Sequence, residues 1–228
     1  MKNLFNVILF DPLLKTLVFF YQHFHDMGLA IILLTIIVRF VLLPFFYKGA
    51  KDQAIMQRLA PKIKEIQKNH KDNLSNQTQE LMKLYKEHRV NPMSSLLLLI
   101  VQLPILIALY QVFLHALKDI TVNHLFLNFI DLSKPNILII VVATIASFYQ
   151  GILSLPKIDK SKVASSAEKM TRRMALMSPM FMVIILFFLP SALGLYILVG
   201  TIFSVIQQIF INKTFKNGLA TGDSNKIN

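Results

Sequence analysis

The sequence contains no cysteine and few charged residues. The absence of cysteine excludes disulfide bonds, thiol catalysis and cysteine-based metal sites, although it does not by itself select a cellular compartment. Only 16% of the 228 residues are charged, whereas 54% are hydrophobic. This balance excludes an ordinary soluble domain and predicts an integral membrane protein.

Acidic residues are missing from every long hydrophobic run, because all 12 Asp and Glu residues lie between these runs or near the chain ends. Proton-coupled pumps and transporters commonly carry charge on Asp, Glu or His residues inside the membrane, and this chain offers no acidic residue for such a relay. Glycine-rich ATP-binding loops and the Gly-x-Ser-x-Gly and His-Glu-x-x-His motifs are also absent. The sequence therefore predicts neither an enzyme nor a cofactor site.

One cation interrupts an uncharged run that is long enough to cross a bilayer. Arg39 lies within residues 28–47, and about 20 apolar residues at 1.5 Å each span ~30 Å of hydrocarbon. Arginine near the centre of a membrane helix costs about 2.5–3.5 kcal/mol on translocon scales. Because Lys48 marks the nearest basic end, roughly 13 Å away along the axis, snorkelling would not bring Arg39 to the interface. We expect Arg39 to face a polar or water-filled cavity.

Four further hydrophobic spans complete the predicted architecture, an all-α integral membrane protein of five transmembrane helices. The run after residue 174 is about twice the length that one span needs, so Pro190 and Gly194 are expected to split it. The predicted segments are an extracytoplasmic interfacial amphipathic helix at 1–27, spans at 28–47, 93–117, 136–155, 175–190 and 191–212, a cytoplasmic helical hairpin at 48–92, an extracytoplasmic loop at 118–135, a cytoplasmic loop at 156–174, and a cytoplasmic tail at 213–228.

Lysine and arginine are distributed very unevenly between the connecting segments. Segments 48–92, 156–173 and 213–228 carry 19 of the 24 basic residues, whereas 1–27 and 118–135 carry 4. The positive-inside rule places the basic segments in the cytoplasm. The N-terminus is therefore predicted outside and the C-terminus inside. The basic loops either only orient the protein or also contact anionic lipid headgroups or ribosomal RNA.

Two amphipathic patterns lie outside the predicted spans. Residues 48–90 predict a helical hairpin, because Ile55, Leu59, Ile63 and Ile66 recur at helical spacing and 69–76 is rich in turn formers. The hairpin is either a solvated element or a docking surface for a substrate or a ribosome. A second apolar stripe, on residues 13–24, predicts a helix lying in the outer membrane interface.

Several short motifs occur in a characteristic order along the chain. Each motif is weak alone, but the full set, with a basic hairpin between the first two spans, closely resembles the YidC/Oxa membrane protein insertases. The motifs are Phe10-Asp-Pro-Leu13, the stretch from Gly28 to Arg39, Met56-Gln-Arg-Leu-Ala-Pro-Lys62, Gln79-Glu-Leu-Met82, Leu84-Tyr-Lys86, Asn91-Pro92, Gln102-Leu-Pro-Ile105 and Leu193-Gly-Leu-Tyr196.

This resemblance implies a minimal five-span insertase and chaperone in the bacterial plasma (inner) membrane. Its helices would enclose a hydrophilic groove that is closed outside and open to the cytoplasm and to lipid. The implied partners are nascent membrane proteins and the lipid bilayer, with the Sec translocon and the ribosome as further possibilities. The protein would act as a monomer without a small-molecule cofactor.

The groove arginine of the family corresponds to Arg39, which would engage hydrophilic parts of a nascent protein. Thr35 lies one turn before Arg39 on the same helix face, and further polar side chains lie on the other spans. For each of these side chains, hydrogen bonding between helices is the competing interpretation. The expected groove residues are Arg39, Thr35, Gln102, Tyr110, Gln150, Tyr196 and Gln207.

A small anion-selective transporter or channel subunit is the competing functional hypothesis. Arg39 would then select anions. A missing inverted repeat and the presence of the cytoplasmic hairpin argue against this function, although oligomerisation could supply a pore.

Overall fold

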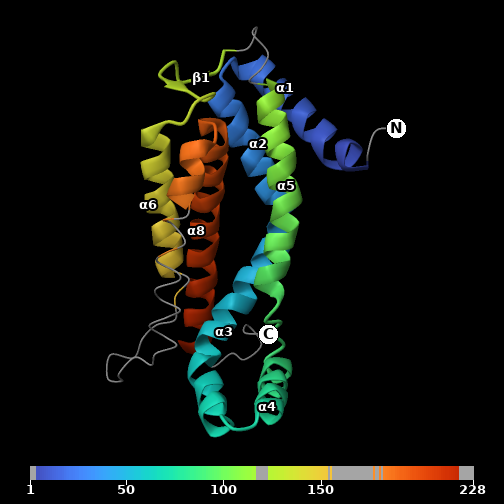
Figure 1. The fold of residues 1–228 in the computed structure, drawn as a ribbon, viewed down its shortest axis with the longest axis vertical. Helices are drawn as coiled ribbons and strands as arrows, with labels where there is room; N and C mark the ends of the chain where they lie inside the picture. The colour runs from blue at the N-terminus through green and yellow to red at the C-terminus, as the bar shows by residue number, and fades with distance from the viewer. Residues whose placement is uncertain are drawn as a thin grey trace.

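A bundle of long helices stands above a helical hairpin, and a further helix crosses its upper end (Figure 1). The structure is a computed structural model. It describes residues 4–116, 123–153, 155, 177, 180 and 182–220, without side chains at 95, 96, 98, 99 and 214–220. The described elements are a π-helical turn (Asn6–Phe10), the helices α1 (Asp11–Phe24), α2 (Met27–Val41), α3 (Leu43–Asn69), α4 (Leu74–Glu87), α5 (Ser94–Ala116), α6 (Ile137–Leu153) and α8 (Ser191–Ala220), and the strands β1 (Leu125–Phe126) and β2 (Ile130–Asp131).

The helix α8 is central to the bundle, because it packs against α6 and α2 and also contacts α3 and α5. Its sequence is apolar from Ser191 to Lys213, which is long enough to cross a membrane. The continuous helix from Asn6 to Phe24 passes the same length and composition test. The location of Asn6–Phe24 in the outer membrane interface therefore stays a prediction, although α1 crosses the upper ends of α2 and α5 in Figure 1.

The first predicted span, 28–47, does not form one straight helix. Helices α2 and α3 meet at Leu42 with a bend of 68°. Pro44 lies in the first turn of α3, where it has no backbone N–H to donate to the preceding turn. The N–H groups of Phe45 and Phe46 both bond to the carbonyl of Leu42. The apolar run therefore turns at residue 42, and its last residues begin the first helix of the hairpin.

The helices α3 and α4 lie side by side below the bundle and form the hairpin that the pattern in 48–90 predicts. Asn73 caps the start of α4, because its side chain accepts a hydrogen bond from the Asn76 N–H. Apolar residues from both helices form a small core, and Ile211 of α8 is buried in the same cluster. The end of α8 thus attaches the hairpin to the bundle. The cytoplasmic location of the hairpin stays a prediction.

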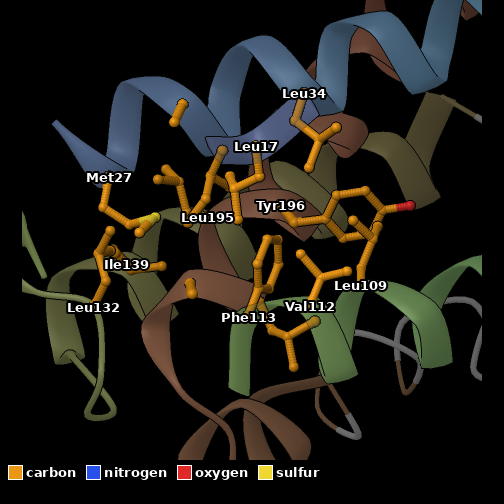
Figure 2. Close-up of a cluster of buried hydrophobic side chains, with 14 of the residues drawn as sticks. Leu17, Met27, Leu34, Leu109, Val112, Phe113, Leu132, Ile139, Leu195 and Tyr196 are labelled. Carbon is orange, nitrogen blue, oxygen red and sulfur yellow. The ribbon is translucent and has the colours of Figure 1, made fainter. Parts of the chain in front are cut away.

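The main core lies in the upper half of the bundle, where α1, α2, α5 and α8 meet (Figure 2). Leu17 of α1, Leu34 of α2 and Phe113 of α5 are almost fully buried there. Tyr196 of α8 is also buried, and its hydroxyl oxygen points away from the apolar cluster in Figure 2. This arrangement removes apolar surface from both water and lipid and fixes the position of α8 relative to α2.

The structure is mostly helical, and the described part of the loop between α5 and α6 adds a short β-hairpin that the sequence did not predict. Strands β1 and β2 pair antiparallel, with Phe126 opposite Ile130. Leu127 and Asn128 at the turn have positive φ angles of 50° and 60°, a left-handed conformation that closes tight hairpins. The β-hairpin is attached to α2, because the Asp26 carboxylate accepts hydrogen bonds from the N–H groups of both Leu29 and Leu127.

The predicted cytoplasmic loop at 156–174 and the end of the tail lie outside the described residues, and the predicted fourth span, 175–190, is described only at 177, 180 and 182–190. Residues 182–188 are helical, and Met182 and Leu186 belong to a cluster that includes Ile140 and Ala143 of α6. The described part of the chain contains two helices that meet the membrane-span test, or three when α2 and α3 count as one bent span. The five-span count stays a prediction.

Candidate functional site

Arg39 lies in the last turn of α2, the end that the distribution of basic residues predicts to face the cytoplasm. Its guanidinium contacts residues of α8 and α3. Its Nη1 donates a hydrogen bond of 3.3 Å to the Ser204 hydroxyl. The guanidinium carbon lies 4.7 Å from the ring centroid of Phe46, within the range of a cation–π contact. The bend at residue 42 brings Phe46 into this position, because it redirects α3 beneath the end of α2.

A glycine on α8 provides the space for the guanidinium. A Cβ atom at Gly200 would overlap the Arg39 Nη2, so no larger residue fits there without moving the arginine. Ser204 follows one turn later and donates its own hydroxyl proton to the Gly200 carbonyl at 2.9 Å. Gly200 and Ser204 therefore form a short concave face on α8 that receives the cation.

A small polar pocket of about 90 Å³ lies next to this arginine. Phe46 and Ser204, the two side chains that contact Arg39, both line it, together with residues of α3, α6 and α8. Amide side chains dominate the lining. The remaining lining residues are Ala50, Gln53, Gln150, Gln207 and Gln208.

Two buried nitrogen atoms in the described part of this region donate no hydrogen bond. The Arg39 Nε and the Gln207 Nε2 are both buried, and neither has a hydrogen-bond partner in the described part of the protein. A buried donor without a partner costs about 1–3 kcal/mol, so both groups favour water or a polar ligand in the pocket. No acidic residue is among the described lining residues, and Arg39 itself lies next to the lining rather than in it. The described part of the site therefore places a cation beside amides without a neutralising carboxylate.

Gln102 of α5 and Tyr196 of α8 form a separate polar pair. The Gln102 amide nitrogen donates a 2.7 Å hydrogen bond to the Tyr196 hydroxyl. Tyr196 is 2% exposed, so the bond joins two helices inside the bundle. This geometry agrees with the competing interpretation of these two residues, hydrogen bonding between helices.

Thr35 and Tyr110, like Gln102 and Tyr196, lie apart from the pocket lining. Thr35 is 1% exposed, and its hydroxyl donates to the Ile31 carbonyl of its own helix at 2.6 Å. Tyr110 lies on the exposed surface of α5, with an exposed fraction of 38%. Gln150 and Gln207 thus line the pocket, and Arg39 is connected to it through its contacts with Ser204 and Phe46, whereas Thr35 and Tyr110 do not line it.

The sequence reasoning missed five residues of this site: Phe46, Gln53, Gly200, Ser204 and Gln208. A signal for three of them was present on α8. Gly200, Ser204 and Gln208 recur every four residues within an otherwise apolar run, which places them on one helix face. Phe46 and Gln53 carried no comparable signal, because their position depends on the bend between α2 and α3.

Known proteins resemble this chain over most of its length. The family model described as "60Kd inner membrane protein" matches residues 19–218. A protein of Clostridium tetani named "Membrane protein insertase YidC" is 35% identical over 200 residues, which are 88% of either chain. "Membrane protein insertase YidC 1" of Listeria monocytogenes is 35% identical over 90% of this chain and 71% of its own length.

Some relatives are considerably longer than this chain. The "Membrane protein insertase YidC" of Geobacter metallireducens is 30% identical over 91% of this chain but only 37% of its own length. A solved structure described as "Active YidC insertase crystal structure with the first transmembrane domain resolved" matches with a TM-score of 0.64 and 28% identity. That match covers 90% of this chain and 46% of the crystallised chain.

The sequence resemblance, the family match and the structural likeness concern the same part of the chain, which includes Arg39, the hairpin and α8. They place the protein in a bacterial inner membrane. The chain belongs to the 60Kd inner membrane protein family, the family of the YidC membrane protein insertases.

Proposed function

We propose that this protein inserts nascent membrane proteins into the bilayer through a hydrophilic groove whose cation is Arg39, and that it assists their folding as a chaperone. One observation carries the proposal of a groove. The partly buried guanidinium keeps an unpaired Nε beside a pocket lined by amides and a hydroxyl and by no carboxylate. Such a site suits the temporary binding of an anionic or polar peptide segment.

The physical obstacle to insertion is the polar end of the substrate. Each peptide group that enters hydrocarbon loses its hydrogen bonds to water, and this loss costs several kcal/mol per group. A polar pocket at the depth of Arg39 shortens the dry path that the polar segment must cross. The amides of Gln150 and Gln207 provide hydrogen bonds along this path, while Arg39 attracts acidic side chains.

The driving force in this mechanism comes from the substrate. Burial of its apolar segment in lipid releases free energy in proportion to the apolar area removed from water. The membrane potential adds to this term when the translocated segment carries charge. The insertase lowers the barrier and returns to its initial state when the substrate has moved laterally into lipid. Cooperation with the Sec translocon, contact with ribosomes and action as a monomer are further parts of this proposal.

The test replaces a host's own insertase with this protein. The host enzyme is depleted, and wild type, Arg39→Lys and Arg39→Ala are compared at equal protein levels. The substrate is a single-span protein with an acidic translocated tail, and a version with a neutral tail is the matched control. Insertion is measured by adding protease outside the membrane, because the protease cleaves the tail only after the tail has crossed.

We expect wild type and Arg39→Lys to insert the acidic tail, and Arg39→Ala to insert it about tenfold less, in line with the loss of a hydrogen bond to a charged group. The neutral tail should depend less on Arg39. Equal insertion of both tails by all three proteins would remove Arg39 from the mechanism. Failure of all three folded proteins would favour the alternative of an anion-selective transporter or channel subunit.

A further inference from the structure

A second and larger pocket lies between the start of α3 and the start of α5, and the insertion mechanism makes no use of it. Its volume is about 280 Å³, close to the lower end of small-molecule sites. It shares no lining residue with the pocket beside Arg39. The lining residues are Pro44, Phe45, Lys48, Gly49, Asn91, Ser94, Leu97 and Val101.

One end of the pocket lining is apolar and the other end is polar, and both helices contribute to each end. Helices α3 and α5 pack against each other and run in opposite directions (Figure 1). The apolar residues Pro44 and Phe45 of α3 therefore lie level with the apolar residues of α5, Leu97 and Val101. One turn further along α3, Lys48 lies level with Asn91 and the beginning of α5. One end of the pocket is thus hydrocarbon-like and the other end is cationic and hydrogen-bonding.

This pocket lies where the apolar part of the bundle ends. The bend at Leu42 precedes Pro44 directly, and α5 is apolar from Leu96 to Leu109 apart from Gln102. Phe45 and Leu97 both line the pocket and are 55% and 53% exposed. In a membrane protein, exposed apolar side chains at this level contact lipid chains, while Lys48 reaches the headgroup region.

Among the lining residues that the structure describes, Lys48 alone is charged. The nearest carboxylate that the structure ties to the pocket is Asp52, which is buried and accepts a hydrogen bond from the Ser94 hydroxyl. Ser94 therefore directs its proton away from the pocket. A phosphate would accordingly be held by Lys48 and the Asn91 amide rather than by Ser94.

We propose that this pocket binds one anionic glycerophospholipid from the surrounding membrane. The phosphate and headgroup lie against Lys48 and Asn91, and the upper part of an acyl chain lies against Phe45, Leu97 and Val101. The charge of Lys48 selects anionic over zwitterionic lipids, because a basic residue near an anionic membrane surface adds about fivefold to affinity. The bound lipid fills the gap between the hairpin and the second long helix.

The absence of tryptophan makes a direct test possible. Phe45→Trp introduces a single fluorophore at the pocket mouth, and Phe148→Trp introduces one on the exposed surface of α6 as a control. Each full-length variant is reconstituted in phosphatidylcholine vesicles that contain a minority of lipid with brominated acyl chains. The brominated lipid is either phosphatidylglycerol or phosphatidylcholine, and quenching reports how much of it contacts the tryptophan.

We expect brominated phosphatidylglycerol to bind at Phe45→Trp about fivefold better than brominated phosphatidylcholine. The ratio should be about one at Phe148→Trp. Adding Lys48→Gln should bring the ratio at the pocket to about one, whereas Lys68→Gln, which removes an exposed lysine from the other end of the same helix, should leave it unchanged. Leu97→Trp on the opposite wall is a second reporter with the same expectation.

Equal quenching by the two lipids at both Phe45→Trp and Leu97→Trp would overturn the proposal. A loss of selectivity with Lys68→Gln as large as that with Lys48→Gln would also overturn it, because it would assign the effect to the total charge of the hairpin. The readout is lipid contact and does not require insertion activity, so this test is independent of the role of Arg39.

Discussion

At the scale of single residues, the surroundings of Arg39 decide what its charge can do. The guanidinium contacts a hydroxyl and an aromatic ring, and neither group neutralises it. Its attraction for an anion is therefore retained, while the hydrogen bond to Ser204 holds it in one orientation. A carboxylate in place of Ser204 would pair with the arginine and cancel this attraction.

Gly200→Ala should move the Arg39 guanidinium without destabilising the fold. The new Cβ would overlap only the end of the flexible Arg39 side chain, and alanine is the better helix former. We expect a folded protein with a displaced guanidinium and about three- to tenfold lower insertion of an acidic tail, the scale of one lost hydrogen bond. The same substitution in an Arg39→Ala background should have no further effect. Two independent losses that add would contradict this explanation.

The β-hairpin formed by β1 and β2 contains a carboxyl group with a lowered pKa. Hydrogen bonding from the Ser133 hydroxyl is the main cause of the lowered pKa of Asp131, with smaller contributions from the Ser133 N–H and Lys134. Because the pKa is lowered in the folded state, these bonds stabilise the loop above the ordinary carboxyl pKa of 3.8, and the stabilisation is lost as the pH falls through the lowered value.

Ser133→Ala should raise the pKa of Asp131 toward the ordinary value, so that the loop loses this stabilisation at a higher pH than in wild type. Carbon-13 NMR titration of labelled aspartates in detergent measures the change. Lys134→Gln should raise the pKa of Asp131 less, because Lys134 Nζ lies 3.4 Å from the carboxylate in an exposed ion pair. An unchanged titration in Ser133→Ala would assign the lowered pKa to another cause.

At the scale of helices, the break between α2 and α3 determines how the hairpin is attached. Its 68° bend directs α3 past the lower ends of α5 and α8. Two contacts then hold the hairpin: the buried Ile211 in its small core, and the hydrogen bond from Ser94 of α5 to Asp52 of α3. The hairpin is therefore coupled to the bundle and cannot move as an independent unit without breaking both contacts.

Ser94→Ala should weaken this attachment. It leaves the buried Asp52 carboxylate without its hydroxyl donor, which costs about 1–3 kcal/mol. We expect faster hydrogen exchange in α3 and at the start of α5, measured by mass spectrometry in detergent. Exchange in α6 should stay as in wild type, because the described part of α6 packs mainly against α8. Ser94→Thr retains the hydroxyl and should restore slow exchange; equally fast exchange in both variants would point to packing instead.

At the scale of the whole molecule, the two ends of the bundle differ in both structure and charge. The β-hairpin and α1 lie at one end, and the basic α3–α4 hairpin lies at the other (Figure 1). Phe126 packs directly on Gly28 at the first end, and the N–H groups of Ser191 and Ala192 bond to carbonyls of the same loop. The polar pocket beside Arg39 lies on the side of the hairpin, since α3 contributes to its lining.

The predicted topology can be measured by cysteine labelling, because the chain has no cysteine of its own. Phe129→Cys, at the 89% exposed tip of the β-hairpin, should react with a membrane-impermeant maleimide in intact cells. Gln67→Cys, on the exposed surface of α3, should react only after the membrane is permeabilised. The opposite pattern would reverse the orientation and remove the argument from the positive-inside rule.

The sequence by itself determined the class of protein, and it predicted the depth of Arg39 and the helical hairpin. These features depend on the length of apolar runs, on periodicity and on charge, all of which are local properties of the chain. It also contained the ordered motifs by which the chain resembles its family. The tail and the fourth span gave predictions of the same kind, which the described residues leave untested.

Only the tertiary structure decided which polar side chains share a site. Gln150 and Gln207 meet beside Arg39, whereas Gln102 pairs with Tyr196 and Thr35 bonds to its own helix. The sequence could not distinguish these outcomes, because the rotation of each helix and the bend at Leu42 depend on packing between residues far apart in the chain. For the same reason, Phe46 and Gly200 acquire their roles only when α2, α3 and α8 come together.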